Sequence, residues 1–328
     1  MEIKENISLS SLNWFRTGGA ARYFCEPVSP EDFRKSLQYA RDQHLELFVL
    51  GEGANILVSD HGFPGLVIRP RNTAIEVTGQ DQETGTVRVR AGSGVGIQDL
   101  IDFCLEHNLG GLEEFSGIPG TVGGAVYINL HYFEHLLSEF LVHGTVIHRE
   151  TGAVQTVDPE WFRFGYDDSR LHEQTHYLLE AEFRLRKISD LETAYARGRR
   201  DETIRHRARR YPESHTCGSF FRNFHPEEVD LSVNGTPMIY VAYYLDKLGI
   251  KGQLAVGNAV VSYQHANMIV NRGTATSGDI AGLAIEMQEM VRDRFGVVPQ
   301  PECQLVGFRE SPLLEPAAPE PQNPATEN

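Results

Sequence analysis

The sequence has no long apolar run, few cysteines and comparatively few basic residues. No stretch approaches the roughly 18 consecutive apolar residues of a membrane-spanning helix, and the start of the chain lacks the apolar segment of a signal peptide. The four cysteines form neither a C-x-x-C pair nor a Cys/His zinc pattern. We therefore expect a cytoplasmic protein with reduced thiols, no bound metal and no membrane contact.

The charge balance is strongly acidic. The chain has 30 Lys and Arg residues against 45 Asp and Glu residues, a formal net charge of −15. General binding to nucleic-acid phosphates needs the opposite balance, so that class is not expected. An anionic small molecule must be held by local donors against an unfavourable overall field. We expect small-molecule partners and a monomer.

The chain of 328 residues exceeds one typical domain, so two or three lobes are expected. After Ile188 the composition shifts to a polar helix rich in arginine, which predicts a domain boundary. Such a helix is more often a solvated face than a binding site. Residues 311–328 combine repeated prolines with few apolar side chains. They are predicted to form a disordered tail without a core.

A short glycine turn near the start decides against the common nucleotide-binding folds. Residues 29–32 have the cap, proline and acids of a helix start, and residues 47–50 have the pattern of a buried strand. The turn at residues 51–55 is followed at once by a second strand, residues 56–58. A Rossmann fingerprint or P-loop needs its glycine turn to open a helix, so both are excluded. Backbone amides of such a turn can still bind an anion.

Further patterns predict a mixed chain of helices and strands. A second glycine segment occupies residues 117–125. Strands are predicted at residues 87–90, 144–147, 178–183 and 268–270, and helices at 97–105, 189–210, 238–248 and 276–296. The segment 216–223 places the hydroxyl of Ser219 between a glycine and two phenylalanines. It has no G-x-S-x-G elbow, which argues against a serine hydrolase.

A series of motifs in one order resembles the UDP-N-acetylenolpyruvoylglucosamine reductases, also called UDP-N-acetylmuramate dehydrogenases. The resemblance runs from about residue 13 to residue 307. It rests on residues 13–21, 50–60, 117–125, 164–166, 217–221, 265–271 and 295–302.

This resemblance implies an α+β protein. Its first two lobes, residues 1–70 and 71–188, would form an FAD-binding fold of the vanillyl-alcohol-oxidase (PCMH) type. Residues 189–310 would form a C-terminal α+β domain that binds the substrate. The implied reaction reduces the enolpyruvyl ether of UDP-N-acetylglucosamine to UDP-N-acetylmuramate in peptidoglycan precursor synthesis. NADPH reduces the FAD and leaves, and the sugar nucleotide takes its place.

The resemblance also implies roles for single residues. Ser219 corresponds to the proton donor, and Glu302 to a glutamate that assists protonation or stabilises the enolate. Neither glycine segment contains a histidine, so the FAD should be non-covalent. The expected substrate contacts are Tyr166, Arg222, Asn223, His265 and Asn267. The expected flavin contacts are mainly glycines, at positions where a side chain would block the close approach of the backbone, together with residues near them in the motifs. They are Arg16, Gly51, Gly53, Ala54, Asn55, Ile56, Gly117, Gly120, Thr121, Gly123, Gly124 and Ala125.

The sequence departs from the family in three places. The catalytic arginine normally follows the Phe-Gly-Tyr step, where this chain has Asp167. Arg170 lies three residues further on and is a candidate replacement, the alternative being that the cation is lost. Residues 129–134 differ from the usual Asn-Ala-Gly-Ala-Tyr-Gly, and residues 224–239 are inserted. Two other functions remain open: an FAD oxidoreductase with a different substrate, and a non-catalytic flavin- or UDP-sugar-binding protein.

Overall fold

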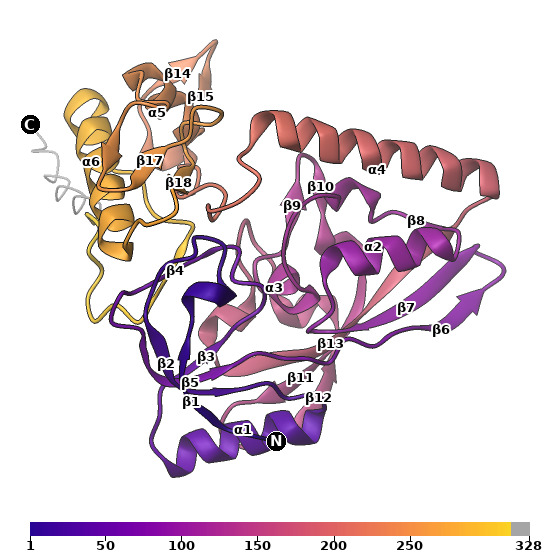
Figure 1. The fold of residues 1–328 in the computed structure, drawn as a ribbon. Helices are drawn as coiled ribbons and strands as arrows, with labels where there is room; N and C mark the ends of the chain where they lie inside the picture. The colour runs from indigo at the N-terminus through magenta and orange to yellow at the C-terminus, as the bar shows by residue number, and fades with distance from the viewer. Residues whose placement is uncertain (316–328) are drawn as a thin grey trace, which may run out of the picture.

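The structure, a computed structural model, describes residues 1–315, which form two β-sheet lobes and a smaller C-terminal lobe (Figure 1). The first lobe has a four-stranded sheet of order β1-β2-β5-β3. β1 is antiparallel to β2, whereas β5 is parallel to both β2 and β3. The elements of this lobe are β1 (Lys4–Ser8), β2 (Ala20–Cys25), α1 (Pro30–Asp42), β3 (Leu47–Val49), β4 (Ile56–Val58) and β5 (Phe63–Ile68).

Helix α1 joins the first two lobes. The Ser29 side chain accepts a hydrogen bond from the Asp32 amide at 3.1 Å, and Pro30 occupies the first turn, as the sequence predicts. The buried face of α1, which includes Phe33 and Leu37, packs against the first sheet and against Ile147 of the second lobe. The helix therefore covers the junction between the two sheets.

The second lobe is a six-stranded sheet of order β12-β11-β13-β7-β6, in which β8 also pairs with β13. Its pairings are antiparallel. Helices α2 and α3 and the long strand β13 enclose its hydrophobic core. The elements are β6 (Ile75–Asp81), β7 (Thr86–Gly92), α2 (Ile97–Glu106), β8 (Leu109–Gly110), α3 (Val122–Tyr127), β9 (His131–Tyr132), β10 (His135–Leu136), β11 (Leu141–His148), β12 (Val154–Val157) and β13 (His176–Lys187).

The arginine-rich segment forms α4 (Asp190–Arg210), which lies across the second lobe above α2 (Figure 1). Ser189 and Glu192 form the capping box at its start. Two of its arginines bind acids beneath the helix: Arg199 pairs with Glu114 and Arg200 with Asp102 at 2.9 Å. Part of the positive charge of α4 is therefore used to attach the helix to the second lobe.

The C-terminal lobe packs α5 and α6 against a three-stranded sheet of order β16-β17-β18. Thr276 caps α6, and Gly296 ends it in a left-handed conformation, as the sequence predicts. The described helices include none that is both long and apolar enough to cross a membrane. The elements are β14 (Ser232–Val233), β15 (Thr236–Pro237), α5 (Val241–Leu248), β16 (Ala255–Val256), β17 (Ala259–Val261), β18 (Ile269–Asn271), α6 (Ser277–Phe295) and β19 (Gln304–Val306).

The final strand attaches the C-terminal lobe to the first lobe. β19 pairs in parallel with β4, with Gln304 opposite Ile56. At the start of α6, the carboxylate of Asp60 accepts hydrogen bonds from the backbone amides of Ser277 and Gly278 at 2.9 and 3.0 Å. These contacts join residues more than 200 positions apart in the chain.

Two sequence predictions need correction. The helix expected from residue 238 begins at Val241, because the Met238 amide instead bonds the Leu231 carbonyl at 2.8 Å. A tail without a core from residue 311 is wrong for residues 311–315: Leu313 is buried, and the Gln288 side chain bonds Leu314 through both its amide atoms. Residues 316–328 lie outside the described residues. The domain limits at 70, 188 and 310 stay predictions.

The packing of Leu313 gives a stability test. We expect Leu313→Ala to lower the free energy of unfolding by about 2 kcal/mol or more, because it empties a buried site of the C-terminal core. Leu191→Ala on the exposed side of α4 is the matched control, with a change within about 0.5 kcal/mol. Urea denaturation measures both. Equal midpoints for the two variants would contradict the burial of Leu313.

Candidate active site

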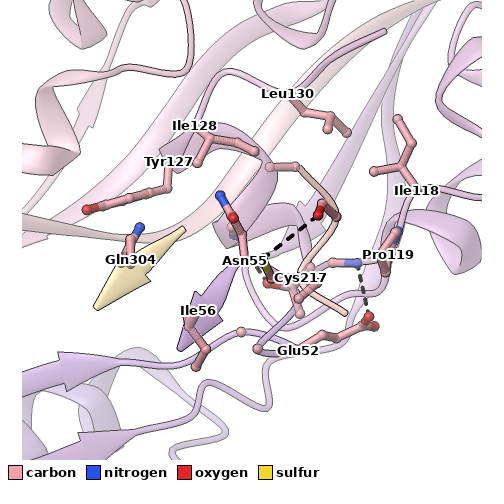
Figure 2. Close-up of a pocket in the computed structure, with 18 of the residues that line it drawn as sticks. Glu52, Asn55, Ile56, Ile118, Pro119, Tyr127, Ile128, Leu130, Cys217 and Gln304 are labelled. Carbon is pink, nitrogen blue, oxygen red and sulfur yellow. Dashed lines mark hydrogen bonds between the residues drawn. The ribbon is translucent and has the colours of Figure 1, made fainter. Parts of the chain in front are cut away.

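A cavity of about 700 Å³ lies where the three lobes meet. This volume suits a cofactor together with part of a substrate. Figure 2 shows Glu52, Asn55 and Ile56 on one side of it, with Tyr127, Ile128 and Leu130 across from them. Both glycine segments, the Ser219 segment and Glu302 contribute to its wall.

The first glycine turn is fixed by contacts with two other segments. The Gly53 carbonyl accepts a hydrogen bond from the Trp14 amide at 2.9 Å, and the Asn55 carbonyl accepts one from the Gln304 amide at 3.1 Å. Gly53 has a left-handed φ of 68°, and a Cβ there would lie 2.5 Å from the Leu12 carbonyl oxygen. A glycine is therefore required at this position. The turn leads directly into β4, as the sequence predicts.

The second glycine segment is attached to the first by Glu52, whose carboxylate accepts a hydrogen bond from the Gly120 amide at 2.9 Å. Unlike the first, this segment opens a helix: Thr121 caps α3 by accepting from the Gly124 amide at 3.2 Å. Sequence reasoning missed Glu52. The sequence signal that could have indicated its role is its position between Gly51 and Gly53, in a turn from which a carboxylate can reach a neighbouring loop.

The residues of this cleft fit a flavin. Gly120 has a φ of 138° with no atom within 4 Å of the place of a Cβ, so its backbone faces open space. The side-chain oxygen of Asn55 is buried and has no hydrogen-bond partner among the described residues, while its nitrogen donates to the Glu302 carbonyl at 3.3 Å. A buried orphan acceptor needs a donor from a ligand or water. The cleft thus offers close backbone approach and an unused acceptor.

The Ser219 segment is positioned by its neighbours. Asn267 bonds Phe221 on both sides: its side-chain oxygen accepts from the Phe221 amide at 3.1 Å, and its nitrogen donates to the Phe221 carbonyl at 2.7 Å. The Phe220 carbonyl accepts from the Glu302 amide at 2.9 Å. Phe220 and Phe221 are fully buried. The hydroxyl-bearing segment and Glu302 are thereby held together at the cavity wall.

Acidic groups gather beside Ser219. Desolvation, followed by the negative charge of Asp167, raises the pKa of Glu302 to about 8. Desolvation and the same two acids raise the pKa of Tyr166 to about 12, and the Tyr166 hydroxyl accepts a hydrogen bond from the Asn223 side chain at 3.0 Å. At neutral pH Glu302 therefore carries a proton that it can donate.

Asp167 is paired with a histidine from the altered segment 129–134. The His131 Nδ1 lies 3.3 Å from an oxygen of Asp167, and the His131 ring centroid lies 4.7 Å from that of Tyr166. Asp167 adopts a left-handed φ of 52°. Its second oxygen is buried without a hydrogen-bond partner among the described residues. Sequence reasoning noted this departure but not that it meets Asp167.

Most of the predicted site residues line the cavity, but four do not. Arg16 is exposed and donates to the Ser11 carbonyl at 2.8 Å. Arg170 stacks on Trp161 at 4.7 Å and lies 3.4 Å from Glu173. In this position Arg170 does not line the cavity, so the geometry gives no support to its role as the missing cation.

The other two are held within the C-terminal lobe. Arg222 forms two hydrogen bonds to Glu228 in the inserted segment, at 2.7 and 2.8 Å. Its charge is therefore already paired. His265 packs near Tyr211, with ring centroids 5.5 Å apart, and accepts a hydrogen bond from the Asn267 amide at 3.3 Å. Burial lowers the pKa of His265, which favours the neutral ring.

One arginine of α4 reaches the cavity. Arg207 donates to the Gly117 carbonyl at 3.1 Å and packs between the rings of Tyr132 and Tyr211, at 5.4 and 5.0 Å. It places a positive charge beside the second glycine segment. The arginine-rich composition was visible in the sequence, but which arginine faces inward depends on the position of α4.

Comparison with known proteins matches both halves of the chain to domains of one kind of enzyme. Residues 21–158 match the FAD binding domain, and residues 210–306 match the C-terminal domain of UDP-N-acetylenolpyruvoylglucosamine reductase. The reductase of Trichormus variabilis is 34% identical over 93% of this chain and 87% of its own length. That of Synechococcus sp. (strain WH7803) is 33% identical over 93% and 94%.

A solved structure supports the same assignment. The UDP-N-acetylenolpyruvylglucosamine reductase of Thermus caldophilus superposes with a TM-score of 0.73 at 25% identity, over 93% of this chain and 99% of that one. The fold and cleft therefore define an FAD-dependent oxidoreductase with a two-lobed FAD-binding fold and a C-terminal α+β domain. The chain belongs to the UDP-N-acetylenolpyruvoylglucosamine reductase family. The fold class and family predicted from the sequence are confirmed.

The open space at Gly120 predicts a defect in cofactor binding. We expect Gly120→Ala to raise the Kd for FAD about tenfold or more, because the new methyl group projects into the cleft. Gly85→Ala is the matched control: Gly85 also has positive φ and open space, but it lies in the β6–β7 turn away from the cavity. Flavin absorbance per protein after dialysis measures both. Equal FAD retention in the two variants would contradict this placement.

The acid pair predicts a shift in titration. We expect Asp167→Asn to lower the pKa of Glu302 from about 8, because a negative neighbour is removed, while desolvation keeps the pKa above the usual value. Asp168→Asn, on an exposed side chain that pairs with His172, is the control. Carboxyl NMR with ¹³C-labelled glutamate measures the titration. An unchanged Glu302 pKa in Asp167→Asn would show that the two acids do not interact.

Proposed function

We propose that this protein uses NADPH to reduce the enolpyruvyl ether of UDP-N-acetylglucosamine to UDP-N-acetylmuramate. The observation that carries the proposal is the joint placement of Ser219 and Glu302 on the wall of the flavin cleft, linked through the hydrogen bond from the Glu302 amide to the Phe220 carbonyl. Proteins named UDP-N-acetylenolpyruvoylglucosamine reductase align with 93% of this chain.

The reaction adds a hydride to the terminal enolpyruvyl carbon and a proton to the adjacent carbon. Bound FAD, once reduced by NADPH, supplies the hydride. Ser219 supplies the proton, since it lines the cavity on a segment that Asn267 holds through two hydrogen bonds to Phe221. Glu302 is protonated at neutral pH and donates a hydrogen bond to the enolate oxygen as charge develops there. As pH rises through about 8, Glu302 loses this proton and its assistance is lost.

The remaining roles follow from this assignment. The two glycine segments hold the FAD without a covalent bond, with Asn55 as an acceptor toward it. Tyr166, Asn223 and Asn267 contact the sugar nucleotide or shape its site. Residues 1–70 and 71–188 form the FAD-binding lobes, and residues 189–310 close over the substrate. We further propose that the protein acts as a cytoplasmic monomer in peptidoglycan precursor synthesis.

Stopped-flow spectroscopy of the flavin tests the function. NADPH should bleach the flavin absorbance of the anaerobic holoprotein, and the enolpyruvyl sugar nucleotide should restore it. Reoxidation by a different acceptor would instead favour another FAD oxidoreductase. If NADPH reduces the flavin but no UDP-sugar reoxidises it, a non-catalytic binding protein is favoured. The observation behind that alternative is Asp167 in place of the family arginine.

The proton donor gives a sharper prediction. We expect Ser219→Ala to slow reoxidation by the sugar nucleotide by about 10²–10⁴-fold, because a positioned acid is lost, with reduction by NADPH unchanged. Ser214→Ala is the control on the same segment, since Ser214 is exposed and contacts His215. If Ser219→Ala reoxidised as fast as the unmodified protein, another group would be the donor.

A further inference from the structure

Two of the departures from the family meet in space. Asp167 occupies the place of the arginine that follows the Phe-Gly-Tyr step, and His131 lies in the altered segment after Gly124. The two side chains are 3.3 Å apart, and both line the cavity that contains Ser219 and Glu302. A change that removes a cation at one position thus coincides with a new basic group at its neighbour.

The local fold holds this pair in place. His131 begins β9, opposite Leu136 of β10 in a tight hairpin. Asp167 lies in a turn closed by the hydrogen bond from the Gly165 amide to the Asp168 carbonyl at 3.0 Å. Asn129 joins the hairpin to the turn: its side-chain nitrogen donates to the Gly165 carbonyl at 3.1 Å, and its oxygen accepts from the Ser138 amide at 3.2 Å.

The charges at this place require a cation when the substrate binds. The enolpyruvyl group carries a carboxylate, and an unpaired Asp167 would repel it. Glu302 stays neutral at pH 7 and adds no positive charge. Arg170 is stacked on Trp161, and Arg207 lies between Tyr132 and Tyr211.

We propose that Asp167 and His131 together replace the family arginine. Asp167 is a positioning residue whose carboxylate lies 3.3 Å from the Nδ1 of His131, a residue that also lines the cavity. The protonated imidazole binds the substrate carboxylate and stabilises the negative charge that reaches it during hydride transfer. This inference rests on the proposed function, because it assigns the carboxylate of that substrate.

The proposal makes substrate binding depend on the proton of His131. Two groups face the imidazole directly from the loop after Phe164: Asp167 and Tyr166. Glu302 lies beyond Asp167. From α4, Arg207 and His206 approach Tyr132, which is next to His131 in the chain. Removing the imidazolium charge, as His131→Ala does, should lower the affinity for the enolpyruvyl sugar nucleotide. UDP-N-acetylglucosamine lacks the carboxylate, and its affinity should be much less affected. The difference between the two ligands isolates the carboxylate contact.

A double-mutant cycle tests the pair, with Kd for the oxidised holoprotein and the rate of flavin reoxidation as readouts. We expect His131→Ala to weaken binding of the enolpyruvyl ligand about tenfold or more and to slow reoxidation, because Asp167 is left as an uncompensated anion. Asp167→Asn alone should also weaken binding. In the His131→Ala background, Asp167→Asn should instead strengthen it, since the repulsion is removed.

Restoring the family arrangement is the second arm. His131→Gly combined with Asp167→Arg should bind the enolpyruvyl ligand at least as well as His131→Ala with Asp167→Asn, because arginine keeps its charge. His135→Ala, at the other strand of the same hairpin and outside the cavity lining, is the matched control. FAD content and the rate of reduction by NADPH show that each variant is folded.

The outcomes separate the inference from the proposed function. If the unmodified protein is never reoxidised by the enolpyruvyl sugar nucleotide, the proposed function fails. If it is reoxidised but His131→Ala binds and reacts as the unmodified protein does, the inference alone is overturned. The inference is also overturned if Asp167→Asn changes the Kd for the enolpyruvyl ligand in the same direction in the unmodified protein and in His131→Ala. If Asp167→Asn weakens binding in the unmodified protein but strengthens it in His131→Ala, the proposed joint role of His131 and Asp167 is supported.

Discussion

The parallel pairing of β4 with β19 is the constraint on which the site depends. β4 follows the first glycine turn, and β19 follows Glu302, so the pairing brings that turn and Glu302 to the same end of two neighbouring strands. The hydrogen bonds of Asn55 with Gln304 and with the Glu302 carbonyl continue this contact beyond the strands. Glu302 then reaches the Ser219 segment through Phe220.

The chemistry of the cavity depends on how charge is distributed in a site withdrawn from water. The chain is acidic overall, yet Arg207 places positive charge beside the second glycine segment. Near Ser219, desolvation and Asp167 keep Glu302 protonated, which converts an acid that would repel an anionic substrate into a hydrogen-bond donor. Asp167 thus lies beside two neighbours: its charge contributes to the raised pKa of Glu302, and its carboxylate is 3.3 Å from the His131 Nδ1.

Local signals in the sequence were sufficient for much of the fold. The caps at Ser29 and Thr276 and the glycine at 296 predicted helix ends that the structure contains, because capping depends on neighbours within a few residues. The glycine segments were predicted as flavin contacts from the resemblance, and the structure places both of them on the cavity wall. Their roles toward a bound ligand stay proposals.

Side-chain partners were harder to predict because they depend on how distant segments meet. Arg222 is paired by Glu228, which belongs to an insertion without a counterpart in the motifs, and Arg170 is turned toward Trp161. The tail was predicted from composition alone, which could not show that Leu313 is buried or that Gln288 offers both a donor and an acceptor to the backbone of Leu314. The pairing of His131 with Asp167 likewise joins two segments that are 36 positions apart.

The attachment of the C-terminal lobe to the first lobe has a consequence for how that lobe can move. β19 lies within the first lobe, Asp60 holds the start of α6, and Asn271 donates a hydrogen bond to the Phe15 carbonyl at 2.8 Å. A hinge that swung the whole C-terminal lobe away would have to break all of these contacts at once. The C-terminal lobe is therefore held against the first lobe at three separate places: its last strand, the start of α6 and the end of β18.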